Sequence, residues 1–145
     1  MVAKEINTSI EIDAPAEAVW EVLTDFSHYS QWNPFIRSIH GEAKQGETLE
    51  VSIQPPGSNG MTFRPVILTL QPGCELRWLG RLLLPGIFDG EHRFQIEPLG
   101  ENRTRLIHGE VFSGLLVPFL WSSLDKQTRQ GFEEMNHALK RQVEQ

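Results

Sequence analysis

Apolar and polar side chains alternate in seven segments of the chain, and a period of two residues predicts β-strands. In the first segment, Ile6, Ile10 and Ile12 share one face, and the residues between these positions are polar or charged. Because successive side chains of a strand point to opposite faces, each segment offers one face to a core and one to water. We expect strands at residues 5–12, 36–40, 49–53, 61–70, 74–79, 91–97 and 104–112.

A period close to 3.6 residues replaces this alternation elsewhere. Asp13 and Pro15 are typical of a helix start, and a short helix is expected to follow them and to end near Asp25. The aromatic segment 26–35 predicts a second short helix or turn. Residues 117–143 carry one apolar stripe, which predicts a long C-terminal helix.

This order of elements predicts a single α+β domain over residues 1–145. We expect a curved antiparallel seven-stranded sheet wrapped around the C-terminal helix, with two short helices after the first strand, which is a helix-grip architecture. Gly131 lies inside the long helix, where glycine costs about 1 kcal/mol relative to alanine. It either permits close approach to the sheet or leaves room for a ligand; simple tolerance of glycine is the alternative.

The last two expected strands carry the most informative chemistry of the chain. His92, His108 and Glu110 fall on the same strand face as Phe94 and other apolar side chains. A hairpin folded about Gly100 places His92 opposite His108, whereas a slip of two residues places His92 opposite Glu110. In both registers two imidazoles and a carboxylate share a mainly apolar face. Such a surface, with few convergent polar groups, is typical of a small-molecule pocket.

These three side chains are consistent with different roles. His92 or His108 could act as a general base that Glu110 orients, because imidazole titrates near neutral pH. Alternatively, the set is a hydrogen-bonded group that anchors the strands or steers a ligand, as buried polar groups usually do. A metal site would need a further ligand that the sequence does not suggest, so neither a metal nor another cofactor is expected.

The aromatic side chains exceed what a small core needs, so some of them are expected to line a cavity. The predicted ligand-binding residues are Trp32, Phe35, Phe63, Trp78, His92, Phe94, His108, Glu110, Phe112, Leu120, Leu124 and Gly131. Each apolar member is, taken alone, also consistent with an ordinary core position. The apolar loop 82–88 is expected either to pack under a helix or in a dimer contact, or to form a lid at the cavity mouth.

The composition of the chain mainly excludes classes of partner and of covalent cross-link. The formal net charge of −6 argues against a nucleic-acid partner, which would usually select a basic face. Cys74 is the single cysteine, so no intrachain disulfide can form. The sequence has neither a signal-peptide pattern nor a run of about 18 apolar residues, so we expect a cytoplasmic protein without stable membrane insertion.

Several short motifs follow one another along nearly the whole chain, at residues 14–20 (APAEAVW), 25–26 (DF), 29 (Y), 32–35 (WNPF), 85–86 (PG), 92–94 (HRF), 104–105 (TR) and 108–114 (HGEVFSG). In this order and spacing they resemble the START-like helix-grip superfamily (SRPBCC), in its polyketide cyclase/dehydrase and lipid-transport branch. The resemblance implies the fold predicted above. Because the superfamily includes lipid carriers, hormone binders and aromatase/cyclases, it does not imply one function.

We therefore predict that the chain binds or carries a hydrophobic or aromatic small molecule, such as a lipid or a polyketide-like compound. The first alternative is a cyclase or dehydratase that uses His92 or His108 as its base, without a metal or nucleotide cofactor. The second is a protein-interaction module, with a homodimer as one form, that uses the loop 82–88. A non-catalytic role is preferred because two histidines beside a carboxylate are more often a hydrogen-bonded group than a catalytic base. The sequence also contains no serine or cysteine nucleophile motif.

Overall fold

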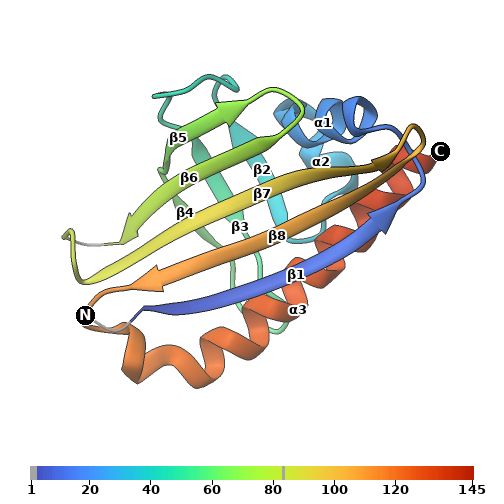
Figure 1. Ribbon diagram of the computed structural model, residues 1–145. Coiled ribbons are helices and arrows are strands. Elements are labelled where there is room, and N and C mark those ends of the chain that lie inside the picture. The colour runs from blue at the N-terminus through green and yellow to red at the C-terminus, as the bar shows by residue number, and fades with distance from the viewer. Residues whose placement is uncertain (1–2, 83) are drawn as a thin grey trace.

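The computed structural model describes residues 3–82 and 84–145. Figure 1 shows one long helix lying against antiparallel strands, so the predicted α+β class and C-terminal helix are confirmed. The strands are β1 (Lys4–Ile12), β2 (Ile36–His40), β3 (Glu50–Ile53), β4 (Met61–Phe63), β5 (Val66–Gln71), β6 (Glu75–Leu82), β7 (Phe88–Gly100) and β8 (Arg103–Ser113). The helices are α1 (Ala16–Thr24), the 3-10 turn η1 (Phe26–His28), α2 (Tyr29–Trp32) and α3 (Val117–Glu144).

The strands form two sheets, so the prediction of one seven-stranded sheet is wrong. One sheet has five strands in the order β1-β8-β7-β6-β5, and the other has three in the order β2-β3-β4. The expected strand 61–70 is divided because Pro65 has no backbone N–H for the ladder and interrupts it. The sheets still meet beside this break, where Leu49 N donates to Pro65 O at 2.8 Å.

The hairpin of β7 and β8 adopts the second of the two expected registers. His92 lies opposite Glu110, and Phe94 lies opposite His108. The hairpin turns at Glu101 and Asn102 instead of at Gly100, and a bulge follows between Pro98 and Gly100. Together they move the pairs from Asp89 to Pro98 by two positions. The side-chain period is two residues, so this slip keeps the same side chains on the inner face.

The core lies between the five-stranded sheet and α3. In Figure 1, α3 runs behind β1 and β8, and the three-stranded sheet lies behind β5 and β6. The inner-face side chains of this layer are fully buried, among them Ile6, Phe94, Leu106, Phe132, Met135 and Leu139. A Cβ on Gly131 would lie 2.4 Å from Cδ1 of Phe35, so this glycine gives room to the segment before β2.

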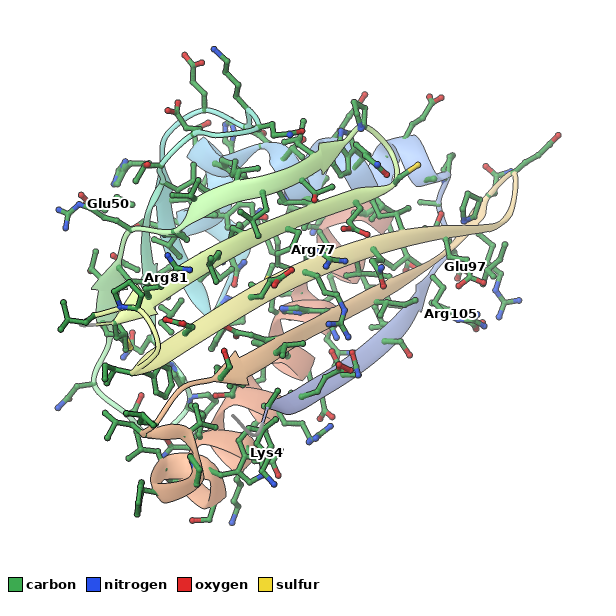
Figure 2. The ribbon with its side chains drawn as sticks, turned by 60° about the vertical axis from the view of Figure 1, so that its left-hand side comes forward. Lys4, Glu50, Arg77, Arg81, Glu97 and Arg105 are labelled. Atoms are coloured by element: carbon green, nitrogen blue, oxygen red, sulfur yellow. The ribbon has the colours of Figure 1, made fainter. Side chains whose placement is uncertain are left out.

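The outer face of the five-stranded sheet is covered by charged pairs (Figure 2). Arg77 on β6 contacts Glu91 on β7 at 2.9 Å, and Arg105 on β8 contacts Glu97 at 3.2 Å. This is the wet face that strand alternation predicts, and it directs the other face of each strand toward α3. Among the described residues, no helix has the length and apolar character needed to cross a membrane.

Candidate functional site

A cavity of about 140 Å³ lies between the inner face of β6, β7 and β8, the three-stranded sheet and α3. Of the predicted ligand-binding residues, those that line it are Phe35, Phe63, Trp78, His92, Glu110, Phe112 and Leu124. Its walls are therefore mainly apolar, and an imidazole and a carboxyl group supply polar atoms. This combination is typical of sites that bind small molecules.

The other predicted ligand-binding residues lie nearby but outside this cavity. Leu120 lines an adjoining groove. Leu82, Phe88 and Leu124 line both this groove and the cavity. Phe94 belongs to the closed core, and Trp32 packs edge-on against Tyr29. His108 lies behind His92, and Gly131 lies against Phe35. Their part in ligand binding stays a prediction.

Two glycines create part of the hollow. Gly80 on β6 pairs with Gly90 on β7, and both line the cavity. Neither glycine has a side chain, so the sheet leaves open space at this pair. At the neighbouring pair, the rings of Trp78 and His92 fill the corresponding space. A Cβ on Gly90 would lie 2.3 Å from Oε2 of Glu110, so the glycine also lets that carboxyl group lie flat against the sheet.

Several wall residues escaped the sequence prediction. Ile36 and Ile53 pair across β2 and β3, and they line the cavity because the small sheet folds toward α3. Met61, Arg81 and Thr128 also line it. The alternation of the strands marked both isoleucines as inward-facing, but nothing in the local sequence indicated a second sheet.

A continuous chain of polar contacts starts at the cavity and ends on β1. Its first link is a close contact, with Oε1 of Glu110 3.3 Å from Nδ1 of His92, and the links after it are hydrogen bonds. Nε2 of His92 is 2.7 Å from Nε2 of His108. Nδ1 of His108 is then 2.8 Å from Oδ1 of Asn136, whose Nδ2 donates to Oγ1 of Thr8 at 2.8 Å. Thr8 donates in turn to the backbone carbonyl of His108 at 2.8 Å. His92 therefore contacts both Glu110 and His108, the two partners that the alternative registers had offered it.

Asn136 and Thr8 are the members of this chain that the sequence did not single out, and Asn136 carried a usable signal. It lies on the buried face of α3 and is 2 % exposed. Its position four residues after Phe132 and three before Leu139 gave a usable signal, because a polar side chain at a core position of an amphipathic helix needs a buried partner. The buried His108 is that partner.

Burial drives the ionisable groups of the chain toward their uncharged forms. Desolvation raises the pKa of Glu110 to about 8. Desolvation, and to a smaller extent the charge of Arg93, lowers the pKa of His92 to about 3. For His108, desolvation and the neighbouring His92 lower the pKa well below its usual value, against a smaller opposite effect of the hydrogen bond to Asn136. The set therefore carries no net charge near pH 7.

Aromatic rings enclose the two histidines. The ring of His108 stacks on Phe132 at a centroid distance of 4.0 Å, and the ring of His92 lies 5.0 Å from that of Trp78. These contacts keep water from the imidazoles and hold their planes. Among the residues described, no group of three histidine, cysteine or acidic side chains is arranged to hold a metal ion.

An apolar surface surrounds the adjoining groove, near the start of α3. Its exposed members are Leu84, Leu115, Leu116, Phe119 and Leu120, and Phe119 is 83 % exposed. Within the loop 82–88, Leu82 and Phe88 line both hollows, which is consistent with a rim at the mouth. Leu83 lies outside the described residues.

Residues 3–144 match the family described as polyketide cyclase / dehydrase and lipid transport. The chain belongs to this family. No curated protein matches the sequence. The family resemblance stated from the sequence is confirmed, and the match covers strands, cavity and long helix together.

Solved structures with this fold include enzymes and a START protein. Zhui aromatase/cyclase from Streptomyces sp. R1128 superposes with a TM-score of 0.79 at 19% identity, covering 99% of this chain and 94% of that one. A START superfamily protein from Mycobacterium smegmatis gives 0.78 at 24% identity, with 97% of each chain covered. A norcoclaurine synthase point mutant from Thalictrum flavum, in complex with a transition-state analogue, gives 0.75 at 14% identity, covering 98% and 94%. At these identities the likeness shows the fold alone.

Proposed function

We propose that this protein binds, and carries, an uncharged hydrophobic small molecule that inserts one ring-sized group between the sheet and α3. The observation that carries this proposal is the cavity itself, whose walls are mainly apolar. Its polar lining residues include Glu110, His92, Thr128 and Arg81, and Arg81 is paired with Asp89 at 3.7 Å. Burial keeps Glu110 and His92 uncharged near pH 7. An uncharged ligand can therefore enter without leaving an unpaired charge in the interior.

The size of the cavity limits what can enter it. Engineered apolar cavities of about 150 Å³ bind benzene, so about 140 Å³ suits one aromatic ring or a short branched alkyl group. A larger ligand would have to extend through the mouth into the groove lined by Leu116 and Leu120. This arrangement supports a carrier that holds one end of its ligand.

Isothermal titration calorimetry with ethylbenzene and 4-ethylphenol tests the proposal. We expect binding of at least one of them, and we expect Leu124→Trp to abolish it, because Leu124 lines the cavity and the larger ring would occupy the space. Leu99→Trp is the matched control, since Leu99 is exposed at the far end of the hairpin. The proposal fails if neither compound binds, or if both variants bind as the wild type does.

Acid–base catalysis is a second candidate function, and the pairing of Glu110 with His92 inside the cavity favours it. Groups whose pKa values are pushed apart by their surroundings are typical of enzymes that move protons. Fold similarity to an aromatase/cyclase and to norcoclaurine synthase is consistent with such a role. His108→Ala should then abolish turnover of a polyketide-like substrate while leaving its affinity largely unchanged, whereas a pure carrier would show no turnover to lose.

A further inference from the structure

In the chain behind the cavity, each side chain can donate a hydrogen bond toward Thr8 or toward Glu110. Only one of these directions pairs every donor with an acceptor and leaves every member uncharged. The direction is fixed at Thr8, because the backbone carbonyl of His108 can only accept. The single hydroxyl proton of Thr8 is used there, so Oγ1 must accept from the side-chain amide of Asn136. The amide oxygen of Asn136 then faces His108, whose Nδ1 must be the donor.

The same logic continues through the two imidazoles. A neutral His108 with its proton on Nδ1 has a bare Nε2, so Nε2 of His92 donates across the 2.7 Å contact. A neutral His92 then presents a bare Nδ1 to Glu110 at 3.3 Å. This bare nitrogen is the acceptor beside the uncharged carboxyl group, so the carboxyl proton lies on Oε1, toward His92.

One other arrangement uses the same number of protons. If each proton moved one step toward β1, His108 would become a cation and Glu110 a carboxylate, at opposite ends of the chain. His92 would separate the two charges. The cation would be buried against the ring of Phe132, and the carboxylate would lie in the mainly apolar cavity. Separated buried charges cost far more than the neutral arrangement, so the neutral chain is the one that the packing selects.

The free oxygen of Glu110 faces the ligand space. Oε1 is used by His92, while Oε2 lies over Gly90, beside the cavity, and has no hydrogen-bond partner in residues 3–82 and 84–145. Since the carboxyl proton is held on the His92 side, Oε2 is a carbonyl-type acceptor. A ligand atom that contacts it must therefore donate a hydrogen bond.

We infer that Asn136 and Thr8 are positioning residues that fix the tautomers of His108 and His92, and that the cavity consequently selects an uncharged ligand with a hydroxyl group, such as a phenol or an alcohol. The ligand class rests on the binding function proposed above, but the direction of the chain does not depend on it. Ether and hydrocarbon analogues lack the donor, and a carboxylate would face the acceptor Oε2. Arg81 also lines the cavity, but it is already paired with Asp89 at 3.7 Å.

Two-bond ¹H–¹⁵N correlation spectra of the imidazole rings test the direction without any ligand. We expect the Nδ1–H tautomer for His108 and the Nε2–H tautomer for His92 at pH 7. Thr8→Val should mix the tautomers of His108, because the amide of Asn136 is then free to turn over. Thr104→Val is the matched control: it removes a buried threonine hydroxyl that bonds to Ala14 O, outside the chain, and should change neither tautomer.

Calorimetry with matched probes tests the ligand class. We expect 4-ethylphenol to bind about fivefold more tightly than 4-ethylanisole, in which a methyl group replaces the hydroxyl proton, because one net hydrogen bond contributes about 1 kcal/mol. Glu110→Gln should keep this preference, since its amide can donate to His92 and its oxygen can accept from the ligand. Glu110→Leu should remove the preference.

The outcomes separate the two proposals. Finding His108 as the Nε2–H tautomer or as a cation would overturn the chain direction, whatever binds. Equal affinities for the phenol and its ether would overturn the ligand class and leave the binding function standing. Binding of neither probe would overturn the binding function and the ligand class together, while the spectra would still decide the direction of the chain.

Discussion

Replacing Glu110 by glutamine should remove a pH dependence of stability that the wild type has. The carboxyl pKa is raised from 4.5 to about 8 on folding, so the folded state keeps a proton that the unfolded state releases. The stabilising contribution of Glu110 is complete below pH 4.5 and is lost as the pH rises through about 8. Glutamine does not titrate, and it can make both hydrogen bonds of a protonated glutamate.

The window in which Glu110 acts alone can be worked out from its neighbours. The pKa of His92 falls from 6.5 to about 3, so its contribution has the opposite sign and is complete only above pH 6.5. Between pH 6.5 and about 8 the contribution of the histidines to the free energy of unfolding is nearly constant. The one proton of Glu110 then changes the free energy of unfolding by about 1.4 kcal/mol per pH unit. Over this window the wild type should lose about 2 kcal/mol relative to Glu110→Gln.

Urea denaturation followed by tryptophan fluorescence, repeated at intervals from pH 6 to 9, measures this difference. Glu97→Gln is the matched control, because Glu97 lies on the neighbouring strand β7 and pairs with Arg105 on the outer face (Figure 2). We expect the control to follow the wild type. If Glu110→Gln also follows the wild type in parallel, the carboxyl group is already ionised in the folded protein and the neutral chain is refuted.

Three further substitutions test the packing around the site. Gly131→Ala should lower the free energy of unfolding in urea by about 1–3 kcal/mol, because its Cβ would meet the ring of Phe35 at 2.4 Å; a more stable variant would contradict this contact. Asn33→Ala should cost about 2–4 kcal/mol in thermal unfolding, because Oδ1 accepts from the backbone N–H groups of Phe35 and Ile36; a loss under about 1 kcal/mol would argue against both bonds. Phe119→Ser should change stability by less than about 0.5 kcal/mol but shift sedimentation toward the monomer; an unchanged profile would exclude a homodimer through this exposed side chain.

Alternation and helical periodicity predicted the elements because those patterns are local. The inward-facing side chains of β7 and β8 were predictable for the same reason. A slip of two residues exchanges the paired residues but leaves each side chain on the same face of the sheet. The register itself was left open between two alternatives. It depends on whether the chain turns at Gly100 or at Glu101 and Asn102, and on the bulge between Pro98 and Gly100. Together these decide whether His92 pairs with Glu110 or with His108.

The division into two sheets could not be predicted from local pattern alone. Pro65 separates β4 from β5 and allows β2, β3 and β4 to form a second sheet. A proline inside a strand indicates an edge or a bulge, but not that the segments on its two sides belong to different sheets. Without that sheet, Ile36 and Ile53 could not be placed on the cavity wall. The role of Asn136 depended on the angle and depth at which α3 meets the sheet, which only tertiary packing sets.

The site also bears on the choice between carrier and enzyme. A general base is most effective when its pKa is near the working pH, and burial lowers the pKa of His92 to about 3. A base-driven cyclase or dehydratase would therefore have to work against this environment. Glu110, with a pKa of about 8, is instead suited to accept a hydrogen bond from a ligand while uncharged. The neutral pair of Glu110 and His92 is therefore what a carrier of uncharged molecules requires.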